Sequence, residues 1–284
     1  MEWVRRERNP WGQDILIGLS WDLLWIAVAI GVLFILAHAV LYFWRWRTPG
    51  TTLSSVSNYH LNSIPERILR HTLASRIFHW VMALSVLTLL LTGFLPILGV
   101  KFSWVTPHWI AGLILTAAVI FHIVHASLWK GLGLIWVNRE DWRDGWAAIK
   151  QVFRPDIPEP AKPGKNPLEN KLFHHAVAIS TLAAVVTGLF MMAKVDTPWW
   201  NRNPYLLSDD TWGVIYVLHG MGSVALITLA LAHFYFALRP EKRWITLSMF
   251  RGWISRERYL EHHDPGRWPI NVAPKQYDQQ IKRP

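Results

Sequence analysis

The chain has 284 residues, of which 52% are hydrophobic and 17% charged, with 19 Trp and no Cys. This composition differs from that of an average soluble domain. The lack of Cys excludes disulfides, Cys-ligated zinc, iron–sulfur clusters held by this chain alone and covalent c-type haem. A redox centre in this chain must therefore be held by histidine.

Five apolar stretches explain the composition. Each is long enough for a helix to cross the hydrocarbon core, which takes roughly 20 residues. They cover residues 23–44, 77–98, 109–129, 172–193 and 214–238. The net charge of +10 lies mostly between these stretches, which excludes nucleic acid as its explanation. The sequence predicts an all-α fold, a polytopic membrane helical bundle with five transmembrane helices.

The charge of the connecting segments predicts the orientation of the spans. Lys and Arg gather in residues 45–76, in residues 130–171 and from residue 239 onward, whereas the segments 99–108 and 194–213 contain few. Basic loops face the cytoplasm in membrane proteins. We therefore expect a cytoplasmic C-terminus and a periplasmic N-terminus, although Arg5, Arg6 and Arg8 argue against this orientation of the first span.

The second and third spans repeat as the fourth and fifth. In the first span of each half, a His is followed thirteen positions later by Thr-Gly: His79 by Thr92-Gly93, and His174 by Thr187-Gly188. In the second span of each half, two His are fourteen positions apart: His108 and His122, and His219 and His233. This predicts an additional N-terminal helix in residues 1–50, a four-helix membrane domain in 51–270 with the repeat 77–129 and 172–238, and a tail in 271–284; the histidines of 51–270 make it the candidate di-haem domain.

Histidine at membrane depth is a functional candidate, because an ionisable side chain there is unfavourable. Fourteen helical residues advance roughly 21 Å and return to the same face, so one helix could present a ring near each side of the membrane. A haem b held by axial His from facing helices fits this pattern. Small positions for the macrocycle are expected at Gly93, Gly112, Gly188, Gly220 and Gly222. By contrast, His38 is expected to be structural, and His262-His263 to lie on a solvated basic surface.

The residues resemble those of a known family. Arg76 to Trp80, His108, His219 and His233, followed by a tail with Ser248-Met249, Gly252 and His262-His263, are similar to the cytochrome b (gamma) subunit of bacterial membrane-bound formate dehydrogenases. The similarity covers residues 70–270 and extends to the b-type cytochromes of NiFe hydrogenases and molybdoenzyme reductases. The chain departs from that subunit in its extra first span, in His122 and His174, and in Asn170, where the family usually has Gln.

The resemblance implies roles for particular residues. His108 and His219 would ligate an outer haem b, and His79 and His233 an inner one. A quinone, menaquinone or ubiquinone, would bind beside the inner haem; its candidate neighbours are Asn166, Glu169, Asn170, Lys171 and His175, with His174 adjacent. The internal repeat leaves open a third haem on His122 and His174, while His174 at the quinone site is the alternative.

Membrane electron transfer is the expected function. The chain would lie in the bacterial inner membrane and pass electrons from an iron–sulfur subunit to the quinone pool. A catalytic subunit with molybdenum, tungsten or NiFe would belong to the same complex, and this complex could form a higher oligomer. It would not itself act on the primary substrate. Two alternatives remain: a stand-alone cytochrome b acting on a small diffusible redox species, and a transporter with a His-lined proton or metal path.

Overall fold

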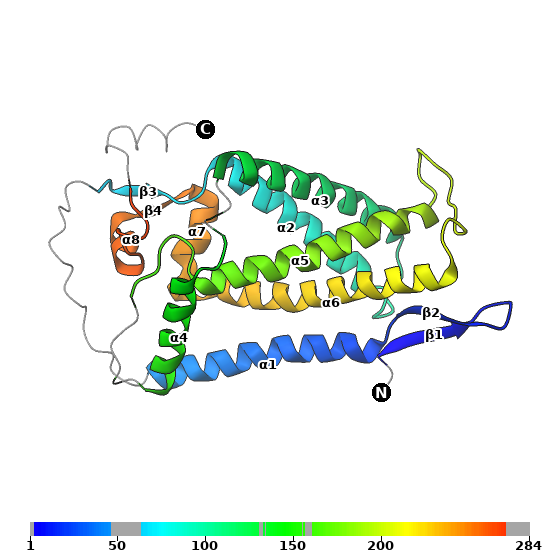
Figure 1. Ribbon diagram of the computed structural model, residues 1–284, viewed down its shortest axis with the longest axis horizontal. Coiled ribbons are helices and arrows are strands. Elements are labelled where there is room, and N and C mark those ends of the chain that lie inside the picture. The colour runs from blue at the N-terminus through cyan, green and yellow to red at the C-terminus, as the bar shows by residue number, and fades with distance from the viewer. Residues whose placement is uncertain are drawn as a thin grey trace. The chain divides into compact units, whose positions relative to one another are not determined.

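The computed structural model describes residues 3–46, 64–130, 133, 135–154, 156 and 161–270. The predicted tail 271–284 lies outside these residues. Five helices are long and apolar enough to cross a membrane, which confirms the predicted all-α polytopic bundle. They are α1 (Trp21–Trp46), α2 (Leu73–Phe94), α3 (Val105–His125), α5 (Leu168–Met191) and α6 (Asp209–Leu238) (Figure 1).

The helix boundaries differ from the expected ones at the ends. α2 was expected over 77–98 but begins at Leu73 and ends at Phe94. Its start is capped by Thr72, whose Oγ1 accepts a hydrogen bond from the backbone N–H of Ser75 at 3.4 Å. After Phe94 the chain turns through Pro96 and Gly99, which has φ of 85°. Apolar residues in this turn therefore extended the expected span beyond the helix.

The described residues fall into two compact units. The first comprises Met1–Leu41, Trp80–Val124 and His175–Phe234, and the second Tyr42–His79, His125–His174 and Tyr235–Pro284. This division cuts across all five long helices and does not follow the predicted boundaries at residues 50 and 270, which stay predictions. The two units are described separately below.

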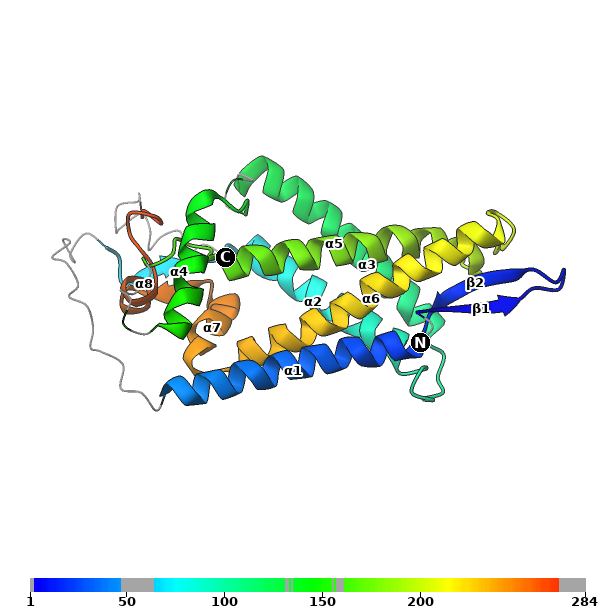
Figure 2. The ribbon, with the colours of Figure 1, turned by 60° about the horizontal axis from the view of Figure 1, so that its bottom comes forward.

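In the first unit, α1 packs along α6 (Figures 1 and 2). Thr228 Oγ1 donates a hydrogen bond to the carbonyl oxygen of Ala27 at 3.0 Å. Gly31 permits this close approach, because a Cβ there would lie 3.4 Å from Leu231 and 3.5 Å from Thr228. α5 and α6 also approach closely at Gly222, where a Cβ would lie 2.9 Å from the carbonyl oxygen of Ser180. Gly222 therefore serves helix packing.

A β-hairpin that the sequence did not predict precedes α1. Strands β1 (Val4–Arg8) and β2 (Asp14–Leu19) pair antiparallel with a register shift between Arg5 and Arg6. The hairpin packs on α6: a Cβ at Gly213 would lie 2.6 Å from the carbonyl oxygen of Leu16, and one at Gly220 3.0 Å from Leu19. Gly220 thus meets the hairpin, so neither Gly220 nor Gly222 is the open position expected for a porphyrin.

The second unit contains small elements that follow or connect the spans. Strands β3 (Arg67–Leu69) and β4 (Trp253–Ser255) pair antiparallel, and α7 (Arg243–Arg251) and α8 (Arg256–His262) flank β4. Ile68, Ile254 and Tyr259 form its apolar core. α4 (Arg139–Phe153) lies in this unit, between the third and fourth spans in the chain.

A buried polar pair joins β3 to the end of α8. The guanidinium of Arg70 donates a hydrogen bond to Nε2 of His263 at 3.1 Å, and Nδ1–H of His263 donates to the carbonyl oxygen of Gly164 at 2.8 Å. Only 3% of His263 is exposed. The expectation of a solvated surface at His262-His263 is therefore wrong for His263, because Arg70 and Gly164, which are distant in sequence, bury and bond its ring.

Candidate functional site

Two histidine rings face each other in the first unit. His108 lies in the first turn of α3 and His219 lies in α6; their ring centroids are 6.3 Å apart and their planes are inclined by 64°. Trp104 packs edge-on against His108, with centroids 6.1 Å apart. The structure thus brings together the two residues that the sequence assigned to the outer haem.

A threonine on a neighbouring helix holds each ring. The hydroxyl of Thr92 in α2 donates to the carbonyl oxygen of Thr88 at 2.7 Å, and that of Thr187 in α5 donates to the carbonyl oxygen of Ala183 at 2.5 Å. The same hydroxyl oxygens lie within hydrogen-bond distance of a histidine, at 2.8 Å from Nδ1 of His108 and 3.0 Å from Nδ1 of His219. Nδ1 of His219 is also 3.1 Å from the carbonyl oxygen of Ala184.

These hydrogen bonds determine which nitrogen can bind a metal. The carbonyl oxygen of Ala184 can only accept a hydrogen bond, so Nδ1 of His219 carries the hydrogen. Nε2 of His219 then keeps its lone pair, which is the arrangement that metal-ligating histidines adopt when their other ring nitrogen donates to a protein oxygen. The contact of Nδ1 of His108 with Thr92 is compatible with the same arrangement.

A glycine follows each threonine and lies beside the histidine ring. A Cβ at Gly188 would lie 3.3 Å from Cε1 of His219, and one at Gly93 would lie 3.7 Å from Cε1 of His108. Each half of the repeat therefore makes the same contacts: Thr meets Nδ1, and Gly leaves room for Cε1. From the sequence, the Thr-Gly pairs were markers of the repeat, and Gly93 and Gly188 were expected to leave room for a macrocycle; the contact of each Thr with a histidine ring was missed.

The pair offers the donor set that a haem iron takes from a protein. Two imidazoles from facing helices, His108 and His219, would hold a haem b between them, and the haem would supply one-electron exchange there. Among the described residues no group of three or more His, Cys, Asp or Glu that could hold a metal ion is found.

The other membrane histidines are divided between the two units. His122 in α3 and His233 in α6 belong to the first unit, and His79 in α2 and His174 in α5 to the second. In the first unit the ring of His233 lies 6.3 Å from that of Phe234. Any pairing among the four, as an inner haem or a third haem, stays a prediction.

The candidate quinone residues lie at the start of α5. Glu169 and Asn170 are exposed, while Asn166 is half-buried. Lys171 is buried, and its Nζ lies 2.6 Å from Oδ2 of Asp141 and 3.3 Å from the carbonyl oxygen of Trp136. Lys171 therefore ties α5 to α4, a role that sequence reasoning missed. His174 and His175 follow in α5, on either side of the unit boundary.

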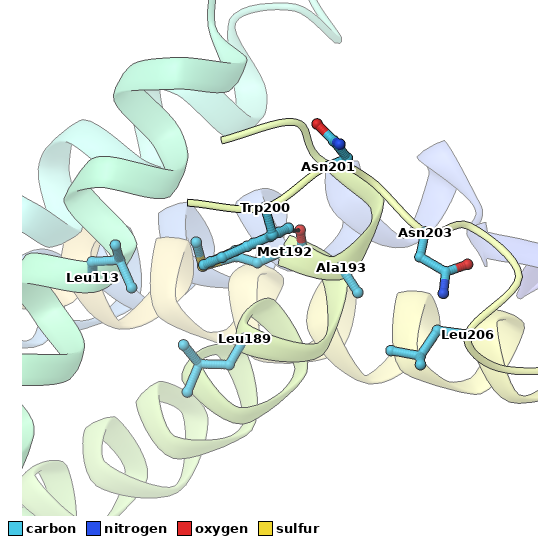
Figure 3. Close-up of a pocket in the computed structure, with 8 residues that line it drawn as sticks. All are labelled: Leu113, Leu189, Met192, Ala193, Trp200, Asn201, Asn203 and Leu206. Carbon is cyan, nitrogen blue, oxygen red and sulfur yellow. Dashed lines mark hydrogen bonds between the residues drawn. The ribbon is translucent and has the colours of Figure 1, made fainter. Parts of the chain in front are cut away.

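The first unit also contains an apolar cavity of about 400 Å³, which the sequence did not predict. Leu113 comes from α3, Leu189 from the end of α5 and the others from the segment leading to α6; the lining residues are Leu113, Leu189, Met192, Ala193, Trp200, Asn201, Asn203 and Leu206 (Figure 3). The indole N–H of Trp200 donates to the carbonyl oxygen of Met192 at 3.2 Å. The cavity has only the two Asn amides as polar side chains in its lining.

Five apolar helices and a pair of neutral histidines held on facing helices define a multi-pass membrane protein suited to carry haem. Residues 70–252 match the family model described as prokaryotic cytochrome b561, and the chain belongs to this family. It is thus a membrane b-type cytochrome, a class in which haem b transfers electrons.

A curated relative agrees with the family. The cytochrome b556 subunit of formate dehydrogenase from Haemophilus influenzae is 24% identical over 219 residues, which cover 71% of this chain and 82% of the relative. The predicted resemblance to the cytochrome subunit of formate dehydrogenases is thereby confirmed.

Proposed function

We propose that this chain is the membrane-anchoring electron-transfer subunit of a respiratory oxidoreductase complex similar to formate dehydrogenase. The observation that carries the proposal is the pair His108 and His219, whose rings face each other from two membrane helices and each contact a threonine through Nδ1. The relative named as a formate dehydrogenase cytochrome subunit supports the kind of complex.

Four histidines would hold two haems b. His108 and His219 ligate the outer haem, and His79 and His233 the inner one, as the fourteen-residue spacing within α6 favours. Haem b supplies reversible one-electron exchange at its iron. The protein keeps the ligating imidazoles neutral, orients them through Thr92 and Thr187, and surrounds them with apolar helices. A third haem on His122 and His174 is the alternative to a quinone role for His174.

Quinone reduction would take place on the side of the membrane where α5 begins. Two electrons delivered through the haems and two protons from the aqueous phase convert the quinone, menaquinone or ubiquinone, into a quinol. Glu169 and His175 are the groups that could pass protons, and Asn166, Asn170 and Lys171 could donate hydrogen bonds to the quinone carbonyls.

The electrons would come from partner subunits. The chain has no Cys, so an iron–sulfur cluster must belong to another subunit, as must the molybdenum, tungsten or NiFe centre that acts on the primary substrate. The complex would lie in the bacterial inner membrane with this chain's N-terminus periplasmic and its C-terminus cytoplasmic, as the distribution of Lys and Arg favours. A higher oligomer of the complex is compatible with this arrangement.

The test is quinol-dependent reduction of haem b in the purified full chain, reconstituted in lipid vesicles. We expect a menaquinol or ubiquinol analogue to reduce the haem, and Glu169→Gln to slow this reduction about a hundredfold, the lower end of general acid–base effects. Glu140→Gln, which also removes an exposed acid near this end of α5, should leave the rate unchanged. Haem that dithionite reduces but neither quinol reduces would contradict the quinone role.

Co-purification tests the partner assignment. The chain extracted in a mild detergent should bring with it a subunit with an electron paramagnetic resonance signal of iron–sulfur clusters. A chain that purifies alone, with full haem content and no such signal, would favour the stand-alone cytochrome.

A further inference from the structure

α4 connects the third span to the fourth and is a well-formed helix. A capping box fixes its start: Oδ1 of Asn138 accepts from the N–H of Asp141, and Oδ2 of Asp141 accepts from the N–H of Asn138, both at 2.8 Å. This pattern makes α4 a regular element of fifteen residues and not an extended loop.

The acidic face of α4 is tied to the protein. Asp141 pairs with Lys171 in the first turn of α5, where both side chains are largely buried. One turn on, Asp144 pairs with Arg267 from the segment after α8. Between them Gly145 lies so close to Leu168 that any side chain at Gly145 would overlap it. α4 is therefore held at the point where the span Leu168–Lys194 begins.

The opposite face of α4 is apolar and exposed. Trp142, Trp146, Ile149 and Phe153 follow one another at spacings of four, three and four residues, which places them in one stripe. Their exposed fractions are 58%, 59%, 51% and 80%. The usual arrangement, with the apolar face on the protein and the polar face in solvent, is reversed. Such a stripe needs a partner, because contiguous apolar surface of this kind is unfavourable in water.

Basic residues border this apolar stripe on one side. Arg139, Arg143, Lys150 and the C-capping Arg154 are all exposed, and at 3.6 residues per turn they follow the edge of the stripe. Nζ of Lys150 lies 5.8 Å from the ring centroid of Trp146. Asp141 and Asp144 thus bind the protein, while the bases lie beside the exposed aromatic rings; Arg143 also lies 3.7 Å from Asp144.

We infer that α4 is a membrane-surface helix whose apolar stripe enters the boundary between headgroups and acyl chains and whose basic stripe binds anionic lipid headgroups. A stripe of Trp and Phe beside a row of Lys and Arg is complementary to an anionic bilayer surface. The attachment of α4 to the first turn of α5 places it at the height where a membrane span begins. The inference rests on the spans and is independent of the electron-transfer function.

The absence of Cys from the chain allows a direct test. Trp146→Cys and Phe153→Cys are each spin-labelled in the full chain, purified with its associated subunits and reconstituted in vesicles containing phosphatidylglycerol. Glu140→Cys is the matched control, since it is exposed on the same helix away from the apolar stripe. We expect labels at 146 and 153 to be several-fold more accessible to oxygen and several-fold less accessible to a water-soluble nickel chelate than the label at 140.

Each other outcome overturns the inference. Nickel accessibility equal to that at position 140 would show a stripe in water, and protection from both oxygen and nickel would show a protein partner on it. Labelled Ile149→Cys provides a further probe of the same stripe if one aromatic replacement lowers the haem content. Two changes test the role of anionic lipid: replacing phosphatidylglycerol by phosphatidylcholine, and introducing Arg143→Gln together with Lys150→Gln. Each should raise the accessibility of the spin label at position 146 to the nickel chelate. No change in either experiment would overturn the role of anionic lipid.

Discussion

The hydroxyl oxygen of Thr187 lies 3.0 Å from Nδ1 of His219, and the same nitrogen lies 3.1 Å from the carbonyl oxygen of Ala184. A carbonyl oxygen can only accept, so Nδ1 of His219 carries the hydrogen. Two groups on α5 thus leave Nε2 as the nitrogen of this α6 ring that could bind iron.

Thr187→Val should weaken the outer haem site. Valine keeps the shape of threonine but cannot accept from Nδ1–H, and loss of such a supporting partner typically lowers metal affinity by 10–100-fold. We expect about a tenfold faster loss of haem b in detergent, followed by absorption. Thr181→Val is the control, because Thr181 is buried in the same helix and its hydroxyl has no hydrogen-bond partner among the residues that the structure describes. Equal haem loss in both variants would contradict the role of Thr187.

Gly188→Ala and Gly93→Ala should differ although they occupy equivalent positions. The added methyl at 188 would lie 3.3 Å from Cε1 of His219 and displace the ring, whereas the methyl at 93 would lie 3.7 Å from Cε1 of His108, an ordinary contact. The electron paramagnetic resonance spectrum of the oxidised haem reports the orientation of axial rings. We expect a shifted outer-haem signal in Gly188→Ala and little change in Gly93→Ala; the reverse order would be inconsistent with the structure.

The second unit should lose stability in acid through His263. Burial, together with the neighbouring charge of Arg70, lowers the pKa of His263 from 6.5 to about 4. The folded state therefore binds fewer protons than the unfolded state between these values, so stability is full above pH 6.5 and falls as the pH drops toward 4. The difference amounts to about 3 kcal/mol at most.

Limited proteolysis between pH 7.5 and 4.5 measures this effect. Cleavage in residues 243–270 should increase as the pH falls, while His263→Ala should be cleaved readily at every pH with a flatter dependence. A wild-type cleavage rate that does not change over this range would contradict the role of His263.

Hydrophobicity predicted the spans, but local hydrogen bonds decided their ends. The run 77–98 contains apolar residues beyond Phe94 that belong to a turn, and Thr72 starts the helix earlier. The N-terminal hairpin was missed because Arg5, Arg6 and Arg8 were interpreted only as charges that bear on the orientation of the first span. α4 had a readable signal in the spacing of Trp142, Trp146, Ile149 and Phe153, which its many charges concealed.

At the candidate site the histidine spacing was informative and the supporting contacts were not. His108 and His219 are equivalent positions of the repeat, so the sequence could pair them. The contacts from Thr92 and Thr187 cross between helices, and the burial of His263 depends on Arg70, 193 positions away. Spacing along one helix carries no information on such contacts.

His122→Ala distinguishes two haems from three. If His122 only bonds within the bundle and His174 serves the quinone site, wild type and variant should both contain about two haems b per chain, as the family pattern predicts. The pyridine haemochrome assay with protein quantification gives this ratio. Three haems in wild type and two in the variant would establish the third site.

The most direct test of the central claim is the haem content of His219→Ala. The substitution leaves the outer iron with His108 as its single protein ligand in an apolar site, so we predict that the ratio of haem b to chain falls by one while the inner haem stays reducible by dithionite. A His219→Ala protein that retains the full wild-type haem content would contradict the assignment of His108 and His219 as the axial pair.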